Sequence, residues 1–76
     1  MSAVDGKRVR ALREALGWPQ MELAYKAGVT QAKLSNIENN VARAGIRADT
    51  LRDLCIALDC SADYLLGMSD EPRRKP

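Results

Sequence analysis

The chain has 76 residues, 12 of them basic and 10 acidic, so it has room for one domain with a net charge of +2. It contains no run of about 18 apolar residues that could span a membrane. It also lacks histidine, the commonest general base and metal ligand.

Alanine and leucine dominate the composition, Phe is absent and strand-favouring residues are scattered, which predicts an all-α domain. The first predicted helix covers residues 3–16. Val9, Leu12 and Leu16 recur at i, i+3 and i+7 and predict one apolar stripe facing the core. Gly17 can end this helix because glycine adopts the left-handed conformation without a Cβ clash.

The second predicted helix covers residues 19–27. Proline is favourable at a first helical position, where its missing N–H would have had no partner, so we place Pro19 there. We interpret Trp18, directly before it, as a core anchor. Four apolar side chains can cover the inner side of this helix: Met21, Leu23, Ala24 and Ala27.

The third predicted helix covers residues 31–38, after a turn at Gly28 and an N-cap at Thr30. At about 100° per residue, Leu34 and Ile37 share its inner face. The outward side chains are small, polar and mostly uncharged: Gln31, Ala32, Ser35, Asn36 and Asn39. A surface helix with no other task more often carries Glu and Lys there, so this face is shaped to enter a DNA major groove.

Two further helices are predicted at residues 48–58 and 62–66, followed by a flexible tail at 69–76. The ordered domain is therefore expected to span residues 1–68. Cys55 and Cys60 lack the spacing of metal ligands and occupy apolar positions, so we interpret them as reduced, buried side chains. The N-terminal residues lack the apolar core of a signal peptide, and we expect a cytoplasmic protein.

The charge distribution is uneven along the chain. Basic residues crowd the first helix, at Lys7, Arg8, Arg10 and Arg13, and acidic residues gather later, at Asp49, Asp53, Asp59 and Asp63. This asymmetry fits one side that faces DNA and one that is turned away. An ordinary solvated surface accounts for the charges equally well.

These segments together resemble the phage-repressor and Cro type of helix-turn-helix domain, also called the xenobiotic-response-element family, over about residues 5–67. GKRVRALREALG is similar to the family's first helix, SNIEN to the end of its third, and TLRDLCIALDCSADYLLG to its closing helices. Ala24 stands where the two helices touch and Gly28 at the turn; the matching apolar positions are Leu23, Val29, Leu34 and Ile37. The resemblance implies a compact five-helix, lambda-repressor-like fold with the helix-turn-helix at its second and third helices.

The resemblance also implies roles for single residues. Gln31, Ala32, Ser35 and Asn36 match positions that face base edges, although Ala32 is short and offers only apolar contact. The residues expected at phosphates are Gln20, Lys33, Asn39, Arg43 and Arg47; for Lys33, plain solvent exposure fits equally well. Gln20 also matches a glutamine that buttresses the recognition helix. Arg13 and Glu38 match a partly buried salt bridge between the first and third helices.

We therefore expect a sequence-specific transcriptional regulator of double-stranded DNA, a repressor or restriction–modification controller, acting as a homodimer on a palindromic operator. Tyr64, Leu65 and Met68 are the expected dimer surface, with Leu66 in the core. An antitoxin or protein-interaction module, whose main partner is another protein, is the alternative. No enzyme activity, cofactor, metal or membrane partner is expected, because the sequence has no His, no phosphate-cradling glycine loop and no paired acids with a reason to be buried.

Overall fold

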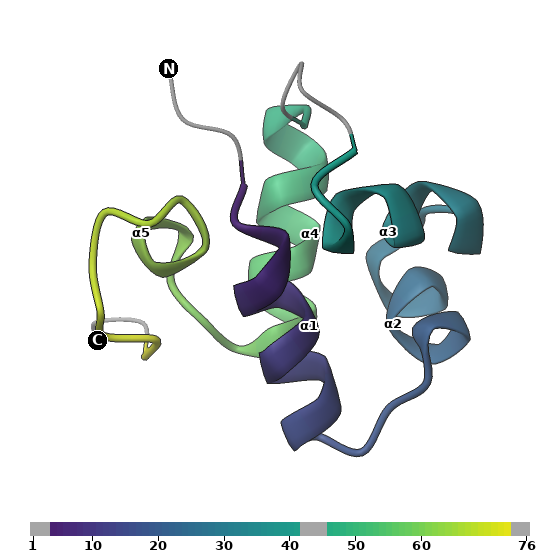
Figure 1. Ribbon diagram of the computed structural model, residues 1–76, viewed down its shortest axis with the longest axis horizontal. Helices are drawn as coiled ribbons and strands as arrows, with labels where there is room; N and C mark the ends of the chain where they lie inside the picture. Colours follow the sequence, from purple (N-terminus) through teal and green to yellow (C-terminus); the bar gives the residue numbers. More distant parts are fainter. Residues whose placement is uncertain (1–3, 42–45, 74–76) are drawn as a thin grey trace.

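The computed structural model describes residues 4–41 and 46–73, and within these ranges the chain forms five α-helices and no strand. The helices are α1 (Gly6–Ala15), α2 (Gln20–Ala27), α3 (Gln31–Glu38), α4 (Ala48–Leu58) and α5 (Ala62–Leu65). The predicted all-α fold is confirmed. Figure 1 shows α1 and α4 in the middle of the molecule, with α2 and α3 on one side and α5 on the other. None of the described helices is long and apolar enough to cross a membrane.

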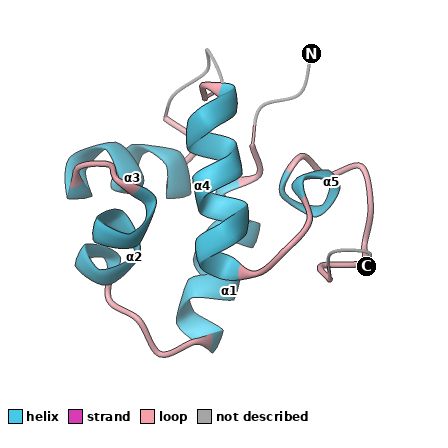
Figure 2. Cartoon of the chain, turned by 180° about the vertical axis from the view of Figure 1, so that it is seen from behind, coloured by secondary structure: helices cyan, strands magenta, loops and turns pink. Residues whose placement is uncertain are grey.

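All five helices contribute to one core. Each supplies one aliphatic side chain with 0% exposure: Val9, Leu23, Leu34, Leu54 and Leu65. Seen from behind, α4 runs between the α2–α3 pair and α5, so it packs against both parts of the molecule (Figure 2). Truncating any one of these side chains to alanine would cost about 2–5 kcal/mol in the free energy of unfolding. The position of α3 therefore depends on the whole core.

The first helix is shorter than predicted, and two residues of its predicted apolar stripe face the core: Val9 is buried and Leu12 is partly buried against it. It begins at Gly6, because Asp5 has an extended backbone and its carboxylate accepts a hydrogen bond of 3.0 Å from the Lys7 amide as an N-cap. The buried residues are Gly6, Val9 and Arg13. Leu16 was predicted to lie in the apolar stripe but is exposed, because the helix ends at Ala15 and its last turn has no apolar partner on that side.

The second helix begins at Gln20, one residue later than predicted. Pro19 is its N-cap, with an extended backbone at ψ 163°, and is not the first helical residue. Met21 was predicted to face inward but is exposed. The buried face is centred between Leu23 and Ala24, and Met21 lies about 115° away from that centre around the helix.

Of the two leucines at the end of α5, Leu65 is the more deeply buried, and Leu66 is partly buried against the core. Leu65 is fully buried and Leu66 is partly exposed, so Leu65 cannot form a dimer surface. The cause is the contact between α5 and the start of α1, where the Asp5 amide donates a hydrogen bond of 2.7 Å to the Leu65 carbonyl. α5 also packs against α4, and Leu65 is buried between these helices. The helix ends at Leu65, one residue earlier than predicted.

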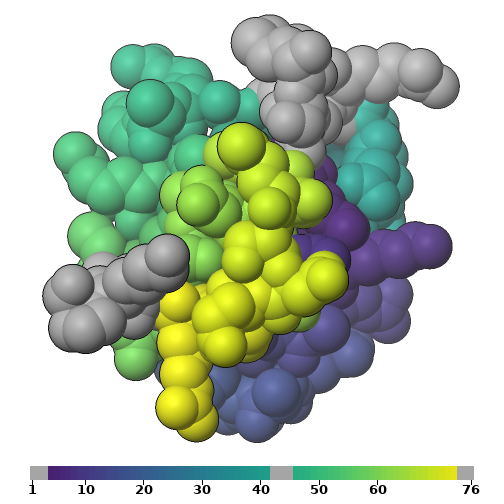
Figure 3. Space-filling view, turned by 90° about the vertical axis from the view of Figure 1, so that its left-hand side faces the viewer, coloured from purple at the N-terminus to yellow at the C-terminus, as the bar shows by residue number. Residues whose placement is uncertain are grey.

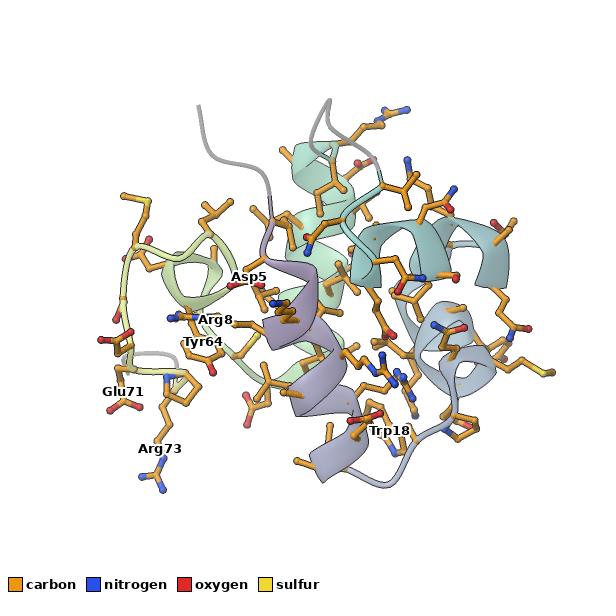
Figure 4. All side chains as sticks on the ribbon, in the orientation of Figure 1. Asp5, Arg8, Trp18, Tyr64, Glu71 and Arg73 are labelled. Carbon is orange, nitrogen blue, oxygen red and sulfur yellow. The ribbon has the colours of Figure 1, made fainter. Side chains whose placement is uncertain are left out.

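The segment predicted to be a flexible tail is hydrogen-bonded to the body of the protein over residues 69–73. The Arg8 guanidinium donates to the Ser69 carbonyl at 2.6 Å and to the Asp70 carboxylate at 3.0 Å. It also lies 4.3 Å from the centre of the Tyr64 ring, as the labelled side chains of Figure 4 show. The Ser61 amide donates to the Pro72 carbonyl at 2.8 Å. Arg8 therefore joins α1, α5 and the segment that follows α5.

Candidate nucleic-acid interface

The turn between α2 and α3 sets the angle at which α3 leaves the body of the protein. Gly28 ends α2 in the left-handed conformation, with φ 69°, which glycine adopts without a Cβ clash. The Val29 amide then donates to the Ala24 carbonyl at 3.0 Å. Thr30 caps α3, its hydroxyl accepting a hydrogen bond of 3.0 Å from the Lys33 amide. The turn is therefore held by backbone and cap hydrogen bonds as the sequence predicts.

The third helix buries one side and presents the other. Leu34 and Ile37 are buried against the core, while Gln31, Ala32, Lys33 and Asn36 are exposed and Ser35 is half-buried. The exposed amides of Gln31 and Asn36 carry both a donor and an acceptor. Such amides can form paired hydrogen bonds with the edge of adenine in the major groove.

A buried polar network attaches the C-terminal end of α3 to α1 and α2. Arg13 donates from Nε to one carboxylate oxygen of Glu38 at 2.7 Å and from a terminal nitrogen to the other at 3.0 Å. A further nitrogen of Arg13 donates to the Trp18 carbonyl at 2.6 Å. The Gln20 amide donates to Glu38 at 3.0 Å. Three elements thus meet at one carboxylate, and Gln20 buttresses α3 directly.

Burial strengthens the network electrostatically. Arg13 is 8% exposed and Glu38 4% exposed. The hydrogen bond to Glu38 and the charge of this carboxylate raise the pKa of Arg13 above its ordinary value, in spite of an opposing effect of desolvation. Arg13 is therefore charged around neutral pH, and a bidentate hydrogen-bonded pair of this geometry resists rotation of either side chain.

Asn39 and Ser35 are also joined. The Asn39 amide donates to the Ser35 hydroxyl at 3.3 Å across one turn at the end of α3. The two side chains therefore form one polar surface. The serine hydroxyl retains its own hydrogen, which can be donated to a base or a phosphate oxygen.

The starts of α2 and α4 differ from those of the other helices. In the described part of the chain, side chains cap α1, α3 and α5, whereas Pro19 and Arg47 provide no side-chain cap for α2 and α4. An uncapped helix start leaves backbone N–H groups available to an anion, although at α4 the Thr50 amide already donates to the Asp49 carboxylate at 2.8 Å. Arg47 is exposed, with Nε 3.5 Å from the Asp49 carboxylate. Arg43 lies outside the described residues.

The basic residues of α1 do not form the predicted positive surface. Arg10 is paired with Glu14 at 3.1 Å, and Arg8 and Arg13 are held by the contacts described above. Three of the four basic residues therefore have an acidic partner. Any attraction to phosphates must come mainly from other groups, such as the helix starts and Lys33, because Arg47 also has an acidic partner in Asp49.

Two features of the site were not predicted from the sequence. The Asn40 side chain, at a residue with φ 56°, accepts a hydrogen bond of 2.9 Å from the Gly6 amide, so the end of α3 is tied to the start of α1. On the outer side of α2, Tyr25 is exposed beside Met21, one helical turn away. Hydrophobicity alone would have placed both Tyr25 and Met21 inside.

Comparison with known proteins adds independent observations. A family model described as a helix-turn-helix domain matches residues 6–71. The HTH-type transcriptional regulator SinR of Bacillus licheniformis is 36% identical over 66 residues, which cover 87% of this chain and 59% of SinR. The antitoxin HipB of Escherichia coli (strain K12) is 50% identical over 32 residues, which cover 42% of this chain and 36% of HipB. The chain spans about half the length of the curated relatives it matches.

Among solved structures, the P22 c2 repressor in complex with a synthetic operator is similar, with a TM-score of 0.77 and 34% identity. The similarity covers 84% of this chain and 94% of that chain. The five-helix, repressor-like fold predicted from the resemblance is confirmed.

Proposed function

The chain belongs to the helix-turn-helix family, and on this premise we propose that it is a sequence-specific transcriptional regulator that places α3 in the major groove of duplex DNA. The observation that carries the proposal is the attachment of α3 by the Arg13–Glu38–Gln20 network. This network holds a polar face outward on a helix whose other face is buried. A helix fixed in this way can read bases without an ordering cost at binding.

Within this proposal, Gln31 and Asn36 hydrogen-bond to base edges, Ser35 contributes one further hydrogen bond, and Ala32 contacts a thymine methyl group. Each paired amide contact discriminates against a wrong base by about 1–3 kcal/mol. The similarity to a repressor crystallised on its operator supports this assignment of the recognition surface.

Phosphate contacts fix the register of α3 in the groove. We assign them to the uncapped starts of α2 and α4, to Gln20 beside the first start and Arg47 at the second, and to Lys33 and Asn39 at the two ends of α3. Arg43, in the segment before α4, remains in the same proposed role. Duplex DNA as the target also places the proposed site of action in the cytoplasm.

We further propose that two copies bind a palindromic operator. One domain of this size reads only a few base pairs, and a twofold dimer presents recognition helices about 34–36 Å apart, in successive major grooves. The molecule measures 29 × 27 × 19 Å, so two copies side by side can reach that spacing. Regulators of this type include repressors and restriction–modification controllers, and repression by occupying the operator is the simplest outcome.

The dimer surface that fits the structure is the face formed by α4 and α5, which lie side by side in Figure 3. Met68 is 70% exposed just after α5, and Ile56 is 58% exposed on α4. Tyr64 is partly covered by Arg8 and can contribute only its remaining edge. Ile56 takes the place of the buried Leu65 in this proposed surface.

Selection of bound duplexes from a random pool tests the proposal directly. The expected result is enrichment of two inverted half-sites spaced by about one helical turn. Binding should weaken steeply as the salt concentration rises, because phosphate contacts release counterions. A pool that shows no enriched sequence after repeated rounds would contradict the proposal.

A second function is favoured by two observations. The match to the antitoxin HipB and the exposed Tyr25 and Met21 on α2 fit a protein whose main partner is another protein. In that case, selection would yield no operator, and substitution of Tyr25 and Met21 would abolish binding to the cognate toxin.

A further inference from the structure

The C-terminal end of α4 brings two cysteines together. Asp59 has φ 53°, its amide donates to the Ile56 carbonyl at 3.3 Å, and the Cys60 amide donates to the Cys55 carbonyl at 3.0 Å. This pair of bonds around a left-handed residue defines a Schellman motif, which a hydrophobic contact between the residues of the outer bond frequently accompanies. Here both of these residues carry a thiol.

Both thiols also border the same depression of the surface. Cys55 is 7% exposed and Cys60 1% exposed. Together with Leu51, Arg52 and Ile56 they line a pocket of about 440 Å³ between α4 and the start of α5. Arg52 and Ile56 are exposed at this pocket, so it is open to solvent. A small reagent can therefore approach the sulfur atoms without global unfolding of the domain.

We propose that Cys55 and Cys60 form a redox-active dithiol, which a two-electron oxidant of the peroxide class converts into an intrachain disulfide. A disulfide requires Cα atoms about 4.4–6.8 Å apart. An N–H···O=C bond that directly joins two residues holds their Cα atoms at about that separation. The proposed site is separate from the DNA-facing surface, borders the proposed dimer surface at Ile56, and concerns the single chain, in which the pocket is open to solvent.

The reaction balances with peroxide as the only co-reactant. The Cys55 thiolate, the more exposed of the two, attacks one peroxide oxygen, the O–O bond breaks, and one water leaves with the sulfur oxidised to a sulfenic acid. The Cys60 thiolate then attacks this sulfur, the S–S bond forms, and the sulfenic oxygen leaves as a second water. Two thiols are oxidised and one peroxide is reduced to two waters.

The test uses the full chain, reduced, freed of reductant and exposed to an equimolar amount of hydrogen peroxide. Remaining thiols are then alkylated in denaturant and the protein is digested with trypsin. Cleavage after Arg52 and after Arg73 releases both cysteines in one peptide, because no Lys or Arg lies between them. The expected result is a monomeric chain whose peptide is unalkylated, two hydrogens lighter, and restored by dithiothreitol.

Cys55→Ser and Cys60→Ser are the matched controls. Each should lose the two-hydrogen change, and Cys60→Ser should instead accumulate a sulfenic acid that dimedone traps. Circular dichroism establishes whether each variant is folded. If a variant does not fold, the mass of the wild-type peptide still decides whether the disulfide forms. The proposal is overturned if both wild-type cysteines remain alkylatable while peroxide oxidises a model dithiol in the same tube. Disulfides only between chains, or only sulfinic and sulfonic acids, would overturn it as well.

Discussion

Arg13 lies in the stripe of α1 where a hydrophobic side chain would be expected, and the placement of α3 depends on it. Its guanidinium spans from Glu38 of α3 to the Trp18 carbonyl in the connection between α1 and α2. A buried charge of this kind is favourable only as long as its partner is present. The residue therefore acts as scaffold, and the reading of DNA is left to the exposed residues of α3.

We expect Glu38→Ala to lower the free energy of unfolding by about 3–5 kcal/mol, because it leaves the buried Arg13 charge without a partner. Arg10→Ala is the matched control: it breaks the exposed pair with Glu14 and should cost less than about 1 kcal/mol. Urea denaturation followed by Trp18 fluorescence measures both. Equal effects of the two substitutions would show that burial adds nothing to the Arg13–Glu38 pair.

The raised pKa of Arg13 has a consequence for pH dependence. A group whose pKa is higher in the folded state contributes fully below its unfolded pKa, and that stability is lost only as the pH rises through the folded value. For a guanidinium this range is strongly alkaline. Arg13 itself should therefore cause no change in stability between about pH 7 and 9, as urea titrations at several pH values can show.

Asn36→Ala should weaken binding to the selected operator by about 5- to 150-fold, which corresponds to the loss of about 1–3 kcal/mol of base contact. Binding to random duplex should be unchanged. Lys33→Ala is the control of the opposite kind. It should weaken binding to the operator and to random duplex alike, and it should reduce by about one the slope of the logarithm of the binding constant against the logarithm of the salt concentration. Competition mobility shifts measure these ratios, and a uniform loss for Asn36→Ala would assign it to phosphate instead.

At the scale of elements, the close approach of α1 to the end of α3 is the contact that a side chain would disrupt. A Cβ on Gly6 would lie 2.6 Å from the Glu38 carbonyl oxygen and nearer still to that of Ile37. Both are backbone atoms that cannot rotate away. Gly6 is thus required for the packing between helices, although it lies at the first position of a helix where alanine would otherwise be favoured.

We therefore expect Gly6→Ala to destabilise the domain by about 1–3 kcal/mol, as overpacking does, and to shift α3 relative to α1. Gly17→Ala is the control, because a Cβ at Gly17 would meet open space. Its only cost would be the strain of placing alanine in the left-handed conformation, at φ 74°, which is about 1 kcal/mol. Thermal unfolding compares the two. If Gly6→Ala also lowers operator affinity and Gly17→Ala does not, the contact serves to position α3.

At the scale of the whole molecule, the two sides of the domain have different tasks. The pair α2–α3 and the helix α5 lie on opposite sides of α1 and α4 (Figure 1). The α2–α3 side carries the polar groups proposed to meet DNA together with the exposed Met21 and Tyr25, and Ile56 on α4 and Met68 after α5 are also exposed. α4 connects the two sides, because it packs against both α2 and α5. A change at the α4–α5 face can therefore reach α3 through the core.

We expect the protein to be dimeric at micromolar concentration, and Ile56→Glu to shift it to monomer because two carboxylates would be brought to one apolar surface. Leu16→Glu is the control, since Leu16 is equally an exposed aliphatic residue but lies at the far end of α1. Sedimentation velocity measures the oligomeric state. The monomeric variant should still bind a single half-site of the operator. A dimer unaffected by Ile56→Glu would exclude this face.

The sequence by itself determined the elements and most of their buried faces. The bounds of α3 and α4, the turn at Gly28 and the cap at Thr30 follow from local periodicity and capping, since each depends on a few neighbouring residues. The pairing of Arg13 with Glu38 was expected from the family resemblance, and their geometry agrees with it. The roles in DNA binding and dimerisation remain proposals for the experiments above.

Only the tertiary structure decided what depends on contacts between distant segments. In so short a segment, periodicity cannot tell Leu65 from Leu66, and the packing of α5 against α1 and α4 decides that Leu65 is the one fully buried. The charge of Arg8 was visible in the sequence, but its engagement by residues that follow α5 was not. A local pattern records which side chains could be buried or charged, whereas packing in three dimensions decides which of them find a partner.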